Sequence, residues 1–129
     1  MFNTGVYNYI NIMDKAADAS WLRNEVINNN IANNDTPGYK RKDVQFDEIL
    51  ATQLKATRYQ NLDDSVNTVR LNTLNAKIYT DSTNYSYRID GNNVDIDTEN
   101  VELASNEIKY NALIDSIGHE FARLKSVIK

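Results

Sequence analysis

The chain has 129 residues, a net charge of −4 and no cysteine. Its length suits a single domain with a modest core, and the lack of cysteine excludes disulfides, thiolate metal sites and cysteine-based catalysis. The acidic balance argues against nucleic acid as a partner, because binding to phosphates needs clustered Lys and Arg. No apolar run approaches the ~18 residues of a membrane-spanning helix, and residues 1–30 show no cleavable secretory signal.

Residues 6–33 are expected to form the first long helix. Apolar side chains recur there at alternating steps of four and three, the spacing of one face of a coiled coil. Two polar residues, Ser20 and Asn24, interrupt this face. They favour a helix that packs in a partly polar assembly, where a buried asparagine fixes the register, over a simple surface helix. The positions of the face are Val6, Ile10, Met13, Ala17, Ser20, Asn24, Ile27 and Ile31.

The helix is expected to end at an asparagine-rich corner, residues 28–39. Pro37, the only proline, lacks a backbone N–H and pushes Thr36 out of helical geometry, and Gly38 supplies the positive φ of a type II turn. The asparagines between positions 28 and 34 lower the intrinsic stability of the helix by about 3 kcal/mol relative to alanine. We therefore expect this segment to form hydrogen bonds with a neighbouring segment or chain.

The middle of the chain is expected to contain short elements. Val44 and Phe46 alternate with polar residues and predict an extended segment, and residues 48–56 predict a brief helix. Residues 57–84 show no clear pattern, and we expect them to be mobile in the isolated subunit. The basic run at residues 40–42 is interpreted as a solvated flank of the turn rather than an anion site.

Residues 85–97 alternate between polar and apolar side chains on either side of a turn sequence and predict a β-hairpin. The turn consists of Asp90, Gly91, Asn92 and Asn93. Its acidic and amide residues lack the EF-hand calcium spacing, because the glycine follows the first aspartate directly. We therefore interpret the stretch as a turn followed by a helix N-cap at Asp97 or Thr98.

The last helix is predicted over residues 98–129. Its coiled-coil face again follows steps of four and three, with one polar interruption, and Val101, Ala104 and Ile108 add a second apolar stripe. Two such helices can bury these faces against each other as an antiparallel pair, yet a pair alone leaves the outer stripes exposed. The positions of the face are Leu103, Glu107, Tyr110, Ile114, Ile117, Phe121, Leu124 and Ile128.

The expected fold class is mainly α, with long N- and C-terminal helices packed as an antiparallel coiled-coil-like pair, a short β-hairpin and a mobile central segment. Within one domain, residues 1–36 form the N-terminal helix, residues 37–97 the turn, extended segments and hairpin, and residues 98–129 the C-terminal helix. No catalytic constellation is visible. His119, the only histidine, is interpreted as an exposed helical residue, and no cofactor is expected.

The corner carries a family resemblance. The run from Asn30 to Lys40, Asn-Ile-Ala-Asn-Asn-Asp-Thr-Pro-Gly-Tyr-Lys, resembles the Asn-Ile-Ala-Asn-x-x-Thr-Pro-Gly-Tyr block of the bacterial flagellar rod and hook protein family. Residues 88–99 resemble a block of one short proximal rod member of that family, and Asn106 and Tyr110 match the same member. The corner residues are Asn30, Ile31, Ala32, Asn33, Thr36, Pro37, Gly38 and Tyr39.

The resemblance implies a structural subunit rather than an enzyme. It implies export through the flagellar type III apparatus without a cleaved signal peptide, and polymerisation above the membrane ring into the proximal rod of the basal body, part of the torque-transmitting drive shaft. The implied partners are other rod and basal-body proteins, the export apparatus and further copies of the chain, with no nucleic acid and no membrane span. The competing class is a soluble helical adaptor or export chaperone. Assembly and helix packing are expected to rest on Ile10, Met13, Ile27, Ile31, Tyr110, Ile114, Ile117, Phe121, Leu124 and Ile128.

Overall fold

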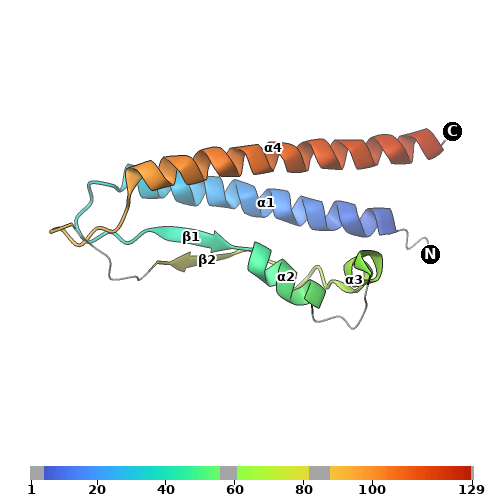
Figure 1. The fold of residues 1–129 in the computed structure, drawn as a ribbon, viewed down its shortest axis with the longest axis horizontal. Coiled ribbons are helices and arrows are strands. Elements are labelled where there is room, and N and C mark those ends of the chain that lie inside the picture. The colour runs from blue at the N-terminus through green and yellow to red at the C-terminus, as the bar shows by residue number, and fades with distance from the viewer. Residues whose placement is uncertain (1–4, 56–60, 82–87, 129) are drawn as a thin grey trace.

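The computed structural model describes residues 5–55, 61–81 and 88–128. Two long helices, α1 (Gly5–Ala32) and α4 (Ile96–Val127), run antiparallel along each other (Figure 1). Between them in sequence come strand β1 (Lys42–Gln45), helices α2 (Asp47–Lys55) and α3 (Leu62–Thr68), and strand β2 (Lys77–Thr80). The expected mainly α fold with paired terminal helices is confirmed.

Helix α1 lies in the middle of three layers. Helix α4 covers one side of α1, and the two strands with α2 and α3 cover the other (Figure 1). Among the helices and strands, α4 packs mainly on α1, so the face of α4 that points away from α1 lies on the outside of the molecule. None of the helices within the described residues is long and apolar enough to cross a membrane.

The main hydrophobic cluster lies on the side of α1 that faces α2 and α3. Ala16 and Ala19 of α1 are buried there with Phe46 and Leu74, and Leu74 is fully buried. The small alanine side chains allow the larger residues to pack closely against the helix. Partly buried side chains complete the cluster, namely Ile12, Ile49, Leu50, Val69, Ala76 and Leu113.

The packed face of α4 is rotated from the predicted coiled-coil face. Glu99 and Asn106 are buried and Leu113 is partly buried, whereas Ile114 and Phe121 are 45% and 53% exposed. The buried face against α1 therefore runs through positions 99, 106 and 113. Half of the predicted face lies beside it and is partly buried, and there the ring centroid of Tyr110 lies 5.8 Å from that of Trp21 on α1. The other half is exposed to solvent. A pattern that searches for apolar residues at heptad spacing overlooks a face whose centre carries a carboxylate and an amide.

The strands lie elsewhere than the predicted hairpin. Strand β1 pairs with β2 as an antiparallel sheet in which Val44 lies opposite Ile78. The prediction of an extended strand at residues 94–97 is wrong, because α4 already begins at Ile96. Most of the first predicted strand of that hairpin falls outside the described residues.

The start of α4 also differs from the prediction. The N-cap is Asp95, whose carboxylate accepts hydrogen bonds from the backbone N–H groups of Asp97 and Thr98 at 3.0 and 3.3 Å. An aspartate in this position satisfies donors that have no partner inside the helix. The N-cap therefore lies two or three residues before the two predicted positions.

The central stretch contains elements that its sequence pattern does not indicate. Helix α3 begins after Asn61, whose side chain accepts from the Asp64 N–H at 2.8 Å, and Val66 of this helix is buried. Strand β2 follows within residues 61–81. The mobility expected for residues 57–84 stays a prediction, and residues 57–60 and 82–84 lie outside the described residues.

Candidate functional site

The corner after α1 has the geometry that its sequence predicts. Helix α1 ends at Ala32, and the Tyr39 N–H donates to the Thr36 carbonyl across the Pro37–Gly38 pair at 3.3 Å. Gly38 has a φ of 73°, the positive value that the third position of a type II turn requires. The predicted helix end and Pro-Gly turn are confirmed.

The turn at Asp90 lies directly against this corner. The Gly38 N–H donates to the Asp90 carbonyl at 2.7 Å, and the Asn93 N–H donates to the Tyr39 carbonyl at 3.4 Å. Gly91 has a φ of 76°, and a Cβ on it would lie 3.8 Å from the Cα of Gly38. The corner block and the predicted hairpin turn, which are far apart in the sequence, therefore form a single structure.

Asn92 holds the turn that follows α1. Its side-chain Nδ2 donates to the carbonyls of Asn33, Asn34 and Thr36 at 2.8, 3.0 and 2.9 Å, and the residue is 1% exposed. These carbonyls belong to the turn after Ala32, and a buried carbonyl left without a donor costs about 1–3 kcal/mol. The Asn92 Oδ1 in turn accepts from the Val94 N–H at 2.8 Å. An amide that lies just before α4 in sequence therefore fixes the turn that follows α1.

Asn30 joins α1 to β1 and α4. It is fully buried, and its Oδ1 accepts from the Lys42 N–H at 2.9 Å and from the Tyr39 hydroxyl at 3.0 Å. Its Nδ2 donates to the Lys42 carbonyl at 2.7 Å and to Glu99 Oε2 at 3.1 Å. All the hydrogen-bonding positions of the amide are thus used. The expected compensation for the asparagine-rich helix end is found at Asn30 within the same chain.

An ionic network extends from Asn30 through Glu99. Glu99 is fully buried, and its Oε1 accepts from Arg41 Nε at 2.7 Å. Arg41 also contacts Asp43 and Asp81, at 3.2 and 3.3 Å. Burial acts to lower the pKa of Arg41, but the hydrogen bonds and negative charges of Glu99 and Asp43 outweigh it and raise the pKa above its ordinary value. The side chain of Arg41 is 17% exposed, so the interpretation of residues 40–42 as a solvated flank is wrong for this residue.

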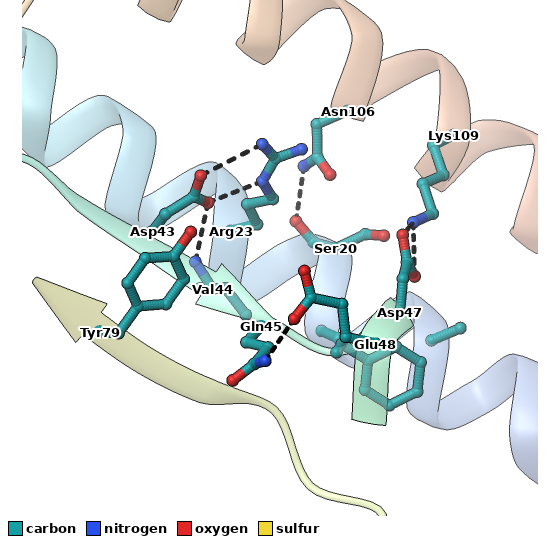
Figure 2. A pocket seen from close by; sticks show the side chains of 13 residues that line it. Ser20, Arg23, Asp43, Val44, Gln45, Asp47, Glu48, Tyr79, Asn106 and Lys109 are labelled. Atoms are coloured by element: carbon teal, nitrogen blue, oxygen red, sulfur yellow. Dashed lines mark hydrogen bonds and ion pairs between the residues drawn. The ribbon is translucent and has the colours of Figure 1, made fainter. Parts of the chain in front are cut away.

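Asp43 connects this network to α1. Arg23 Nε lies 2.9 Å from Asp43 Oδ1, as Figure 2 shows, and Arg23 Nη2 lies 2.7 Å from Glu102 Oε2 on α4. Burial by itself would raise the pKa of Asp43, but hydrogen bonds from Arg23, from the Val44 N–H and from Arg41 lower it overall. The hydrogen bond to Asp43 raises the pKa of Arg23. Charged groups therefore link α1, β1 and α4 beside the corner.

A groove of about 510 Å³ opens next to Asp43, between α4, α1 and the junction of β1 with α2 (Figure 2). Across it, Lys109 of α4 forms an ion pair of 2.7 Å with Asp47 at the start of α2. The side chain of Gln45 donates to Glu48 at its lower edge. Within the described part of the chain, no three His, Cys, Asp or Glu side chains gather as a metal site. The paired polar groups of the groove hold the layers together.

Asn106 fixes the position of α4 along α1. It is buried, and its Nδ2 donates to the Ser20 carbonyl and to Asn24 Oδ1, each at 2.7 Å. The two polar residues that interrupt the apolar face of α1 therefore meet an amide of α4. A shift in register would leave this buried amide without acceptors, as with a buried asparagine in a coiled coil.

The structure divides the predicted packing residues into three groups. Ile10 and Ile27 are buried, and Ile114, Phe121 and Ile128 are 45%, 53% and 73% exposed. The exposed side chains do not contribute to the core of the chain. Their role in assembly stays a prediction. The partly buried group comprises Met13, Ile31, Tyr110, Ile117 and Leu124.

The charged residues of the corner were not predicted from the sequence as parts of a site. Arg23, Arg41, Asp43 and Glu99 have no spacing that marks them as partners, because they come from α1, the segment around β1 and α4. One signal is present in the sequence: positions 99, 106 and 113 are seven residues apart, the repeat of a packed helix face.

No protein-family model matches the chain. The chain is 37% identical to "Flagellar basal body rod protein FlgB" of Bacillus subtilis, over 99% of this chain and 95% of that protein. It is 34% identical to the protein of the same name from Borrelia hermsii, over 93% of this chain and 95% of that protein. The corresponding protein of Escherichia coli is 29% identical over 83% of each chain.

All three relatives are flagellar rod proteins, the class that the corner block with its Thr-Pro-Gly-Tyr turn predicts. Two relatives above 30% identity match nearly the whole length of the chain. The chain belongs to the FlgB family of flagellar basal body rod proteins.

Proposed function

We propose that the chain is a non-enzymatic subunit of the proximal rod, which polymerises above the membrane ring and helps to transmit torque. The observation that supports this proposal most strongly is the apolar surface that α4 leaves uncovered. Ile114, Phe121 and Ile128 recur every seven residues and are 45%, 53% and 73% exposed. Ile114 and Phe121 lie on one side of α4, and Ile128 is its C-cap. A row of apolar residues at this spacing is the kind of surface that a neighbouring helix covers in a coiled coil.

A second stripe lies on a different side of α4. Val101 and Ile108 are also seven residues apart and are 68% and 72% exposed. A subunit with apolar stripes on two sides can contact a different neighbour through each. Such head-to-tail contacts generate open helical assemblies when they do not close into a ring. The arrangement thus suits a subunit of a filament better than an adaptor whose apolar surface is covered in a small complex.

The corner supplies the rigidity that a torque-bearing subunit needs. Asn30, Asn92 and Glu99 are each at most 1% exposed and are held by several hydrogen bonds. Satisfied polar networks of this kind fix one geometry, because any movement leaves buried polar groups without partners. The end of α1, the loop before α4 and strand β1 therefore move as one body.

The proposed partners are further copies of the chain, other rod and basal-body proteins, and the flagellar type III export apparatus. Export by this route is proposed to leave the chain uncleaved. The intact mass of the protein recovered from purified basal bodies tests this point. A mass equal to that of the full chain supports uncleaved export, and a mass reduced by an N-terminal segment contradicts it.

A gene deletion combined with purified basal bodies tests the proposal. The deletion strain is expected to form membrane rings that lack a rod and to lose swimming, and the intact chain should restore both. A tagged chain should also be present in the purified rods. Complete rods in the deletion strain would overturn the proposal. A rodless phenotype with no tagged chain in purified rods of the complemented strain would favour an export chaperone instead.

A further inference from the structure

Strand β2 presents an open backbone edge. The two-stranded sheet stands on its edge against α1, with β1 next to the helix and β2 on the outside (Figure 1). Every residue of β2 is exposed, and Ile78 and Tyr79 are 52% and 47% exposed. An exposed edge of this kind is a template for pairing with another strand.

The register identifies the backbone groups that face outward. The Asp81 N–H donates to the Arg41 carbonyl at 2.8 Å. Tyr79 lies two residues before Asp81, so its backbone N–H and C=O groups face the same side of the strand, toward β1. Hydrogen-bonded pairs alternate along an antiparallel ladder, so the backbone of Tyr79 bonds to β1, and the N–H and C=O groups of Ile78 and Thr80 point outward. No backbone hydrogen bond to these outward groups is present within the described residues.

The opposite edge of the sheet is closed. The outward N–H and C=O groups of Lys42 on β1 bond to the side chain of Asn30, at 2.9 and 2.7 Å. The next outward donor, the Val44 N–H, bonds to Asp43 Oδ1 at 2.7 Å. The sheet can therefore be extended through β2 alone. Two copies of the chain can join their sheets only β2 to β2, about a two-fold axis.

We propose that β2 is a self-association edge, on which a second copy of this chain pairs its own β2 in antiparallel orientation about an axis at Tyr79. Ile78 of each copy then lies opposite Thr80 of the other, and the outward groups of both residues are satisfied. The inference is independent of the function proposed above, because it concerns an edge that neither apolar stripe of α4 includes.

Charge complementarity selects this axis. Lys77 makes no ion pair within the described residues, and an axis at Tyr79 places it opposite Asp81 of the second copy. Asp81 in turn already accepts from Arg41 at 3.3 Å, so its carboxylate is held at the sheet. Opposite charges directly across from each other stabilise a sheet. An axis at Ile78 would instead place Lys77 opposite Tyr79 and would lose both charge pairs.

A two-fold contact of this kind closes on itself and cannot propagate a helical filament. The β2 pair is therefore a contact between free chains and not a filament contact, and it covers an edge that would otherwise promote aggregation. The strand has four residues, so the pairing is weak and reversible, and detection requires covalent trapping.

Single-cysteine trapping in the full chain tests the pairing, because the natural sequence has no cysteine. Tyr79→Cys places the two sulfurs on a non-hydrogen-bonded pair, where a Cα separation of about 4.5 Å suits a disulfide. Thr80→Cys is the matched control, since its two copies would lie beyond the roughly 7 Å limit for bridging. We expect Tyr79→Cys to form the disulfide dimer about ten-fold faster than Thr80→Cys under mild oxidation.

Two further substitutions, each added to Tyr79→Cys, separate pairing from random collision. Ile78→Pro removes an outward N–H that the β1–β2 ladder does not use, and Lys77→Glu places like charges across the axis. Each should slow trapping to the Thr80→Cys rate while the circular dichroism spectrum stays unchanged. Equal trapping of Tyr79→Cys and Thr80→Cys, faster trapping of Ile78→Cys than of Tyr79→Cys, or no slowing by Lys77→Glu would overturn the inference. None of these outcomes affects the rodless phenotype that tests the proposed function.

Discussion

Asn30 and Lys42 are joined in the way that two residues of paired strands are joined. The Asn30 Nδ2 donates to the Lys42 carbonyl at 2.7 Å, and its Oδ1 accepts from the Lys42 N–H at 2.9 Å. The side chain of a helix residue therefore replaces the neighbouring strand that β1 lacks on this side. Because the same amide donates to Glu99 of α4 at 3.1 Å, one residue sets the relative position of three elements.

Replacing Asn30 with alanine should lower the free energy of unfolding by roughly 3 kcal/mol, because buried groups of Lys42 and Glu99 lose their partners. The matched control is Asn28→Ala, which removes an exposed asparagine from the same helix. The control should be neutral or slightly stabilising, since alanine has the higher helix propensity. Urea unfolding of both variants measures the difference. Equal stabilities would show that the Asn30 contacts contribute nothing.

Replacing Asn92 with aspartate should destabilise the chain at neutral pH by about 2 kcal/mol, at least as much as Asn92→Ala. Aspartate keeps the acceptor for the Val94 N–H, but it removes the donor and places a negative charge against the carbonyls of Asn33, Asn34 and Thr36. Thermal unfolding of both variants between pH 7 and pH 4 measures the effect. Protonation of the new carboxyl restores a donor, so Asn92→Asp should recover relative to Asn92→Ala in acid. A wild-type stability of Asn92→Asp at pH 7 would contradict the role of Asn92 in holding the turn.

The parts of the fold that local sequence determines could be predicted. Pro37 ends α1 and Gly38 permits the turn through their own backbone preferences, so the corner follows from a few adjacent residues. The alternation around Val44 likewise indicates β1. The position of β2 could not be predicted in the same way, because its four residues are exposed and carry no burial pattern of their own. Its partner strand lies beyond α2 and α3 in the sequence.

For a related reason, the amides of the candidate site could be predicted from the sequence but its ion pairs could not. The amides at Asn30 and Asn92 belong to stretches that stand out by composition and turn chemistry. Arg41 and Glu99 contribute to the site through their contact with each other, and they lie 58 positions apart in the sequence. Judged by its charge alone, Arg41 was therefore predicted to be a surface residue. Hydrophobic periodicity detects apolar positions only. It therefore found the partly buried row of α4 that includes Tyr110, but it missed the buried row at Asn106 and included the exposed row at Phe121 instead.

Replacing Asp43 with asparagine should lower stability by about 2 kcal/mol at pH 7, because Arg23 and Arg41 lose a shared carboxylate. The pKa of Asp43 is lower in the folded chain than its ordinary value, so folding favours the charged form. This contribution is fully present above the unfolded pKa, near 4, and is lost as the pH falls through the lower folded pKa. The difference between wild type and Asp43→Asn should therefore shrink below about pH 4.

Urea unfolding at pH 7, 5, 4 and 3 measures that difference. Asp18→Asn, which removes an exposed carboxylate of α1, controls for the change in net charge. A difference between wild type and Asp43→Asn that stays constant from pH 7 to pH 3 would mean that packing, not the charge of Asp43, makes the contribution.

Phe121→Asp should abolish incorporation into the rod while the isolated chain still folds. Phe121 is 53% exposed, so the loss of stability should stay near 1 kcal/mol, but a carboxylate in the Ile114–Ile128 stripe cannot be buried against an apolar neighbour. Ser116→Asp is the matched control, because it adds the same charge to α4 at an exposed position. Ser116 lies seven residues from both Lys109 and Arg123, so it is on a polar side of the helix. Swimming assays and tagged-protein content of purified basal bodies measure the outcome. Normal motility of Phe121→Asp, or an equal loss for both variants, would show that the stripe is not an assembly surface.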